Sequence, residues 1–324
     1  MKAVLCKEYG PPDKLSVESI AELKPGPGQV VVTVKACGVN FPDTLIIQGK
    51  YQFKPPFPFS PGSEIAGMVK ETGEGVSNVK PGDRVMAFTG WGGFAEEVVA
   101  EAGEIISMPP GLDFTTASAF VLTYGTSHHA LKDRAQLKAG ETLLVLGAAG
   151  GVGLAAIEIG KIMGARVIAA ASSQEKLDVC REHGADEFIN YTTENLKDRL
   201  KALTGGKGVN VVYDPVGGGY SEVALRGMAW NGRFLVIGFT AGEIPRIPLN
   251  LPLLKGCAIV GVFWGSFTTH EPERNREHLQ ELLGWLKEGK LKPHISATYP
   301  LEGATQALQD MMDRKVKGKI VLVP

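Results

Sequence analysis

Short apolar runs separated by glycine and proline dominate the first hundred residues. The runs at 2–9, 17–23 and 29–39 are rich in valine, isoleucine and leucine, and the segment KPGPG at 24–28 separates the second run from the third. Further segments with β-branched residues between Gly and Pro turns follow at 64–73, 83–88 and 94–100. Because runs of this kind are typical of strands, this region is predicted to be mostly β.

From about Leu112 the apolar positions recur every three or four residues, behind a helix cap at Asp113 or Thr115. After Gly140, strand-like runs alternate with helical ones. The strands are expected at 142–148, 165–172, 187–191, 209–216 and 233–239, with helices at 153–164, 174–184, 194–205 and 220–228. Strands joined by helices of this length form parallel sheets covered on both faces, so the fold class is predicted as α/β with a doubly wound nucleotide-binding sheet.

The last part of the chain is predicted to return to the first. A strand at 255–265 that includes Trp264 is expected at the edge of the sheet, followed by an amphipathic helix at 274–289. The tail then alternates polar and apolar residues as the first region does. We therefore expect a first domain at 1–122, a cofactor-binding domain at 123–266, and a return to the first domain at 267–324.

The charge balance and cysteine content narrow the classes of protein. Lys and Arg total 34 against 35 Asp and Glu, and no sustained basic stripe exists that would suit nucleic acid or an anionic membrane. The 44% hydrophobic and 21% charged residues exclude a disordered or fibrous chain. The four cysteines, at 6, 37, 180 and 257, form no CxxC pair, which favours neither disulfides nor a zinc knuckle and suits a reducing compartment.

The first residues and the longest uncharged run indicate no membrane or secretion signal. Lys7 and Glu8 interrupt the apolar start of the chain before a signal-peptide core could form. The longest uncharged run, 142–157, is shorter than the roughly 20 residues that a membrane span needs. A cytoplasmic protein is expected.

A glycine-rich turn at 147–153 is the strongest chemical signal. It reads GAAGGVG, follows the strand TLLVL and opens a helix, which is the context of a dinucleotide fingerprint. Missing side chains let backbone N–H groups approach a pyrophosphate, and the helix N-terminus adds partial positive charge.

The end of the next strand indicates which nicotinamide cofactor fits. Where an acidic residue would hold a ribose 2′-hydroxyl, the sequence reads AASSQEK at 170–176, without a carboxylate at the strand end. The hydroxyls of Ser172 and Ser173 and the charge of Lys176 suit a 2′-phosphate, so NADPH is expected rather than NADH. The alternative is structural, with Ser172 as a helix cap and Lys176 as a solvated charge.

Five segments together resemble one known family. They are ACGVNFPDTLIIQGKY at 36–51, LTYGTSHHAL at 122–131, GAAGGVG at 147–153, VVYDPVGG at 211–218 and GKIVLVP at 318–324. Across essentially the whole chain they resemble the zinc-free quinone oxidoreductase branch, which includes zeta-crystallin, of the medium-chain dehydrogenase/reductase superfamily. The resemblance implies a GroES-like catalytic domain, an inserted Rossmann domain and a homodimer joined at an apolar edge strand.

The zinc ligands of the superfamily's alcohol dehydrogenases are missing. Where those enzymes have a Cys-His and a His-Glu pair, this chain has Asn40-Phe41 and Ser63-Glu64. Zinc needs imidazole or thiolate ligands, so no catalytic metal is expected, and Cys37 is interpreted as a small buried residue.

The resemblance also assigns roles. Asn40 and Thr123 would lie against the nicotinamide, and Asp43 and Tyr51 would border the substrate cleft. The cofactor residues would be Ala149, Gly150, Gly151, Val152, Gly153, Ser172, Ser173, Lys176, Tyr191, Gly238, Phe239, Phe263 and Gly265. Tyr51 or Asn40 could stabilise charge on the acceptor oxygen, although Tyr51, in a Pro-rich loop, could equally be a covering aromatic.

Other candidates favour structural roles. His128 and His129 are adjacent on a helical stretch and point to different faces, which suits neither a metal pair nor a proton relay, so they are interpreted as core or surface histidines. Asp214 ends a strand where ligands bind in such folds, but a turn-forming role is preferred for it.

The leading hypothesis is an NADPH-dependent, zinc-independent reductase of quinones or activated enones that works by direct hydride transfer. One alternative is an enoyl-thioester reductase of the enoyl-CoA type, with Lys50, Lys54 and Arg246 as contributors to a coenzyme A phosphate site. Another is a non-catalytic NADPH- or RNA-binding protein of the crystallin type. The sequence leaves the physiological acceptor open.

Overall fold

The computed structural model describes residues 1–324, which divide into two compact units. The first unit contains Met1–Leu122 together with Pro293–Pro324, and the second contains Thr123–Lys292. None of the helices combines the length and the apolar composition needed to cross a membrane.

The first unit is built on a seven-stranded sheet with a separate two-stranded pair, β1 and β2. The main path of the sheet runs β14-β15-β3-β4-β5-β7, and β6 pairs with β3. The strands are β1 (Lys2–Leu5), β2 (Ser16–Ser19), β3 (Gln29–Val39), β4 (Glu64–Thr72), β5 (Arg84–Phe88), β6 (Glu97–Glu101), β7 (Ile106–Ser107), β14 (Ile295–Pro300) and β15 (Lys319–Val323). The α-helices are α1 (Phe41–Ile46), α2 (Phe114–Ala117) and α11 (Ala304–Met312), with short 3₁₀ turns at η1 (Pro12–Lys14), η2 (Ala102–Glu104) and η4 (Leu301–Gly303).

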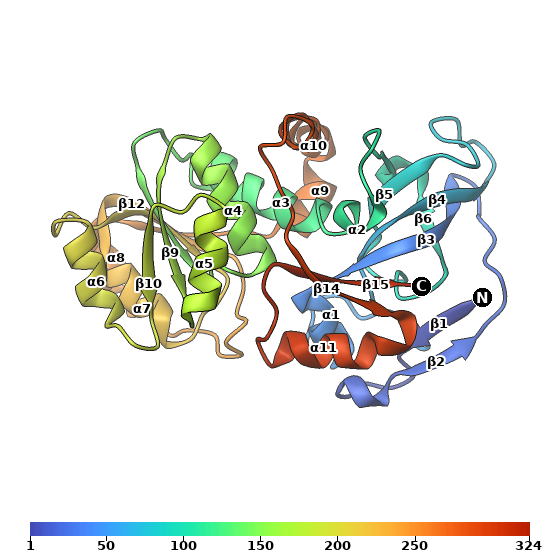
Figure 1. Ribbon diagram of the computed structural model, residues 1–324, viewed down its shortest axis with the longest axis horizontal. Coiled ribbons are helices and arrows are strands. Elements are labelled where there is room, and N and C mark those ends of the chain that lie inside the picture. Colours follow the sequence, from blue (N-terminus) through green and yellow to red (C-terminus); the bar gives the residue numbers. More distant parts are fainter. The chain divides into compact units, whose positions relative to one another are not determined.

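The end of the chain completes this sheet. β15 pairs antiparallel with β3, so that Ile320 lies opposite Val39 and Leu322 opposite Cys37. Figure 1 shows the C-terminal strand, in red, beside the blue strand β3. Ile320 and Leu322 are fully buried in the same core as Val32. The pairing therefore brings the start of β15 next to the end of β3, although 279 residues separate Asn40 from Lys319 in the chain.

The second unit is a six-stranded parallel sheet in the order β10-β9-β8-β11-β12-β13. Numbered along the chain, this is the 3-2-1-4-5-6 order of a dinucleotide-binding fold, which confirms the predicted fold class. The strands are β8 (Thr142–Leu146), β9 (Arg166–Ala171), β10 (Glu187–Asn190), β11 (Val209–Asp214), β12 (Met228–Val236) and β13 (Ala258–Gly261).

Helices cover both faces of this sheet. Figure 1 shows α4 (Gly151–Ile162) and α5 (Gln174–Glu182) on one face, and α6 (Leu196–Leu203), α7 (Gly219–Arg226) and α8 (Asn250–Lys255) on the other. The remaining helices are α3 (Val121–His128), the π-helix η3 (His129–Arg134), α9 (Trp264–His270) and α10 (Pro272–Lys287). Leucine and valine make up four of the five residues of β8, and three of the six residues of β11 are valine, as expected for strands that are buried on both sides.

One local expectation is wrong. Trp264 does not belong to the edge strand: β13 ends at Gly261, and Trp264 is the first residue of α9, where it is buried against Gly125.

The first region is mostly β, as predicted, and it also contains the short helix α1. This helix has a proline at its second position and is capped by hydrogen bonds between Asn40 and Asp43.

The second unit also extends further than the predicted boundary at residue 266. It continues to Lys292 because α10 is tied to the helical stretch after α3. Arg274 pairs with Asp133, and His128 hydrogen-bonds to Glu281. The returning segment therefore contains residues 293–324.

Candidate active site

The glycine turn at the end of β8 has the geometry of an anion cradle. Gly147 has a φ of +55°, a conformation that side chains disfavour, and Gly150 is the N-cap of α4. Leu154 is the first residue of α4 whose N–H donates a backbone hydrogen bond along the helix, to the Gly150 carbonyl at 2.9 Å. The amides of residues 151–153 therefore face out of the helix end, where a phosphate would accept from them.

Gly153 cannot carry a side chain in this turn. A Cβ there would lie 2.6 Å from the Ala148 carbonyl oxygen and 2.7 Å from that of Gly147. The turn thus leaves no room for a side chain at the point where the strand meets the helix, and its residue types fit a pyrophosphate. Ala149, Gly150, Gly151, Val152 and Gly153 all belong to it.

Hydroxyl groups and a lysine gather at the end of β9. Ser173 is the N-cap of α5 and accepts from the Lys176 N–H at 3.4 Å, so Ser173 and not Ser172 caps the helix. The Lys176 Nζ donates to the Ser172 hydroxyl at 3.2 Å. Tyr191 follows β10 and donates its N–H to the Ala171 carbonyl at 3.1 Å, which sets its backbone beside the end of β9.

The ends of β11 and β12 contribute the other predicted cofactor residues. Asp214 is buried and accepts from the N–H groups of Val216 and Gly217 and from the Ser221 hydroxyl, so it shapes the turn, as preferred from the sequence. Gly238 donates its N–H to the Asp214 carbonyl at 3.3 Å, and a Cβ on Gly217 would approach the Phe239 ring to 2.9 Å.

All of these residues lie at one edge of the second unit. The carboxyl ends of parallel strands share that edge, which is where this class of sheet binds its ligands. Phe263 and Gly265 follow β13 at the start of α9, and Phe263 is 45% exposed. Thr123 lies on α3 in the same unit and is buried.

The first unit contains a buried polar cluster centred on Lys319. Its Nζ donates to the Asn40 Oδ1 at 2.5 Å and lies 3.1 Å from the Glu64 Oε2. All three side chains are at least 95% buried. The second Glu64 oxygen accepts from the Leu122 N–H at 2.9 Å. Sequence reasoning missed Lys319, because only the pairing of β15 with β3 brings it to Asn40.

This cluster fixes the orientation of the Asn40 amide. The oxygen faces Lys319, and the Nδ2 donates to the Glu64 Oε2 and to the Gly38 carbonyl, both at 3.2 Å. Both hydrogens of the amide nitrogen are therefore used inside the chain. Asn40 is thus held in a defined position, and its amide is not available as the donor to an acceptor oxygen that the sequence also allowed.

Asp43 and Tyr51 lie in the same unit. Asp43 accepts from the Asn40 N–H at 2.7 Å, and burial raises the pKa of Asp43 to about 7. Tyr51 is partly buried, with its ring 5.8 Å from that of Phe53. Burial and, after it, the charge of Asp43 raise the pKa of Tyr51, so its hydroxyl keeps its proton at neutral pH.

The donor atoms in this cluster do not fit zinc. The anionic oxygen that faces it, Glu64 Oε2, already pairs with an ammonium, and Asn40 and Ser63 stand where a thiolate and an imidazole would be needed. Burial raises the pKa of the Cys37 thiol well above its ordinary value, so Cys37 is a neutral thiol and not the thiolate that a metal binds. All four cysteines are free.

Two family models match this chain. The alcohol dehydrogenase GroES-like domain matches residues 26–110, and the zinc-binding dehydrogenase model matches residues 151–287. The chain is 44% identical over 328 residues to the quinone oxidoreductase-like protein 2 homolog of Nematostella vectensis, an alignment that covers 99% of this chain and 88% of that protein.

Solved structures are similar over the full length. A probable oxidoreductase from Mycobacterium abscessus has a TM-score of 0.90 and 42% identity, covering 100% of this chain and 99% of that one. The quinone oxidoreductase of Escherichia coli, complexed with NADPH, has a TM-score of 0.93 and 30% identity, covering 100% of both chains.

Replacing Asp43 by Asn should flatten the pH dependence of stability. Because the pKa of Asp43 is raised to about 7, the native protein keeps a proton that the unfolded chain, with an Asp pKa of about 3.9, releases as the pH rises. The native chain should lose up to roughly 4 kcal/mol of unfolding free energy between about pH 4 and pH 7, and no more above that range.

The check is urea unfolding of both proteins at about pH 5 and pH 7.5. An asparagine oxygen still accepts from the Asn40 N–H and does not titrate, so Asp43→Asn should narrow the difference in unfolding free energy between the two pH values. An equal pH dependence in the two proteins would contradict the buried, protonated Asp43.

Proposed function

The chain belongs to the medium-chain dehydrogenase/reductase superfamily, in its quinone oxidoreductase branch, and from this premise we propose that it catalyses the NADPH-dependent, zinc-independent reduction of quinones or activated enones by direct hydride transfer. The predicted family and the oxidoreductase class are confirmed by the comparisons. The observation that carries the proposal is the buried ammonium of Lys319, bonded to Asn40 and Glu64.

Zinc independence is supported by the charge in that cluster. In a metal site, a carboxylate is neutralised by the metal ion. Here the ammonium of Lys319 already neutralises the Glu64 carboxylate. A metal at these oxygens would have to displace this ammonium, without a thiolate or an imidazole to compensate. Lys319 is thus a positioning residue, which holds the Asn40 amide and neutralises Glu64.

The preference for NADPH is supported by the end of β9. Its two serines and Lys176 supply hydroxyl donors and an ammonium group, and no carboxylate is there to repel a 2′-phosphate. The glycine turn at 147–153 would hold the pyrophosphate, with Ser172, Ser173, Lys176 and Tyr191 at the adenosine end.

The chain's own residues would position the acceptor and supply a proton donor. When bound, the reduced nicotinamide supplies the hydride, and charge then develops on the carbonyl oxygen of the acceptor. Tyr51 is proposed as the donor to that oxygen, because its hydroxyl carries a proton at neutral pH, whereas both amide hydrogens of Asn40 bond inside the chain. For a quinone, the hydride and this one proton complete the hydroquinone, whereas the enolate formed from an enone takes its one proton at the carbon next to the carbonyl.

The first test is NADPH oxidation by the chelator-treated protein with ortho-quinones, para-quinones, simple enones and an enoyl-CoA as acceptors. Acceptor-dependent oxidation that survives the chelator and exceeds the rate with NADH is expected. The best acceptor would distinguish quinone from enoyl-thioester reduction. Tight NADPH binding with no turnover on any acceptor would overturn the proposal and favour a non-catalytic binding protein.

A matched pair of variants tests the cofactor preference within this experiment. Lys176→Ala should reduce the ratio of kcat/KM for NADPH to that for NADH by about ten-fold, the effect of losing about 1.4 kcal/mol of charge-assisted binding. Lys201→Ala, an exposed lysine on α6, should leave the ratio unchanged.

Replacing Tyr51 by Phe should lower kcat by about ten- to a hundred-fold with little change in the KM for NADPH, because only the proton donor is removed. Stopped-flow absorbance of NADPH under saturating acceptor measures the effect. Unchanged turnover would remove Tyr51 from the acid role and leave it as an aromatic that covers the domain.

We also propose a homodimer, supported by the exposed edge of the second unit. β13 pairs with β12 alone, and Ile259 is 40% exposed on it. Four further apolar side chains are more than 70% exposed on or near α8 and the turn of β12, namely Trp230, Leu249, Leu253 and Leu254. An exposed strand edge beside such a surface needs a partner.

Sedimentation velocity tests this proposal and should give about twice the mass of the chain. Leu253→Glu, which places a charge on the exposed surface, should shift the measured mass toward that of the monomer. A native chain that sediments as a monomer at micromolar concentration would contradict the proposal.

A further inference from the structure

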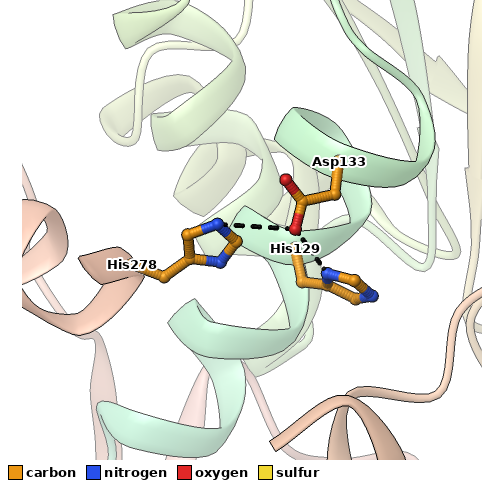
Figure 2. A group of neighbouring side chains, drawn as sticks. All are labelled: His129, Asp133 and His278. Atoms are coloured by element: carbon orange, nitrogen blue, oxygen red, sulfur yellow. Dashed lines mark hydrogen bonds and ion pairs between the residues drawn. The ribbon is translucent and has the colours of Figure 1, made fainter. Parts of the chain in front are cut away.

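Three buried side chains with ligand-forming atoms meet in the second unit, on elements that the proposed reductase site does not use. His129 and Asp133 come from the π-helix η3, and His278 comes from α10. Figure 2 shows both imidazoles turned toward the same carboxylate oxygen. The Asp133 Oδ2 lies 2.8 Å from the His129 Nδ1 and 3.4 Å from the His278 Nε2, and the three ligand atoms all lie within 4.8 Å of one another.

The π-helix explains why His129 and Asp133 share a face. Residues four apart lie close to one another on a helix surface, and the wider π turn keeps the fifth residue nearly above the first. The adjacent His128 points elsewhere and bonds to Glu281 at 2.8 Å. The expectation that the two histidines face different sides is therefore met, but His129 gains a second histidine from a distant helix.

His278 is the side chain that the structure leaves unexplained. It is 96% buried, its Nδ1 has no hydrogen-bond partner, and its Nε2 makes only the 3.4 Å contact with Asp133. Buried polar atoms normally have a partner, so an imidazole of this kind points to a group that completes its contacts. Its nearest ring neighbours are His128 and Phe267, with ring centroids 4.4 Å and 5.4 Å away, and no hydrogen bond joins either of them to His278.

The donor types suit a cation. His129 and His278 each bring an imidazole nitrogen to the Asp133 Oδ2, and Arg274 bonds to the other oxygen of that carboxylate. On binding an ion, the His129 Nδ1 would give up its hydrogen bond to Asp133 and present its lone pair. Two neutral imidazoles and one carboxylate are a ligand set that a zinc-type ion binds.

The spacing also suits a zinc-type ion. Ligands at about 2.1 Å in a tetrahedral site lie roughly 3.4 Å apart, which is the separation of the His278 Nε2 from the Asp133 Oδ2. The His129 Nδ1 and the Asp133 Oδ2 are now hydrogen-bonded at 2.8 Å, and their separation would lengthen by about half an ångström on binding the ion. Arg274 bonds to the other oxygen, Asp133 Oδ1, at 2.5 Å, so it orients the carboxylate without occupying the Oδ2.

We propose that His129, Asp133 and His278 form a binding site for a divalent transition-metal ion of the zinc type, with water as the fourth ligand. The ion ties η3 to α10 and takes no part in hydride transfer. Zinc bound at this cluster would therefore be no evidence for a catalytic metal beside Asn40.

The test uses the full chain, treated with chelator and dialysed, with Zn²⁺ alone and Co²⁺ alone as probes. Equilibrium dialysis with elemental analysis should give one Zn²⁺ bound per chain, and Co²⁺ should develop the visible absorption of a four-coordinate site. Saturating Zn²⁺ should also raise the Tm, because an ion that binds only the folded state stabilises it.

Two variants test the imidazole ligands, and a third is their control. His278→Asn and His129→Gln should each weaken Zn²⁺ binding by about ten-fold or more and abolish the cobalt absorption, since each removes an imidazole donor. His270→Asn changes an exposed histidine on α9 and should bind as the native chain does. Circular dichroism and NADPH binding check that each variant is folded, and NADPH oxidation should not change on adding or removing the ion.

Absence of stoichiometric binding by the native chain would overturn the proposal and leave the cluster as a hydrogen-bond network. Native-like affinity in both folded His129 and His278 variants would overturn it as well. Loss of NADPH oxidation in parallel with the ion would instead place a metal in the reaction and contradict the proposed zinc-independent function.

Discussion

The buried ion pair of Lys319 and Glu64 is the interaction on which the first unit's site depends. Both groups lose nearly all their contact with water, a cost that only close pairing and further hydrogen bonds can offset. Asn40 and the Leu122 amide supply those bonds. The pair also links the fold to the site, because Lys319 reaches Asn40 only when β15 completes the sheet beside β3. The returning segment is thus part of this buried polar cluster and not only a structural extension.

The second unit depends on a different feature, a glycine turn that leaves backbone amides exposed for an anion. Gly153 and Gly147 remove side chains where the strand turns into α4, and the parallel strand order places the ends of β9, β11 and β12 along the same edge. In the function proposed above, the hydroxyls and the ammonium at the end of β9 favour a ribose that carries a 2′-phosphate. The second unit thus supplies the backbone cradle that the proposed dinucleotide needs, and the first unit supplies a rigid polar cluster in which Lys319 neutralises Glu64.

The sequence was most informative where a signal is local. Periodicity predicted the alternating strands and helices after Gly140, and the glycine turn could be placed because its strand and helix are adjacent to it. The partners of Asn40 could not be predicted, since Lys319 is 279 residues away and only tertiary pairing joins them. The same holds for His278, which meets His129 across two helices. Trp264 was predicted to lie in a strand because its apolar neighbours continue the pattern of β13. In the structure it is the first residue of α9 and packs against Gly125.

A double-mutant cycle on Lys319→Met and Glu64→Gln tests most directly whether the buried cation holds this site together. Each single variant leaves one buried partner unsatisfied and should lose about 3–5 kcal/mol of unfolding free energy, whereas the double variant should recover most of that loss. Hydride transfer, measured as a single turnover of NADPH, should be slower in the folded double variant, with a smaller change in Lys319→Arg. Additive stability losses together with native hydride transfer in all variants would contradict the account.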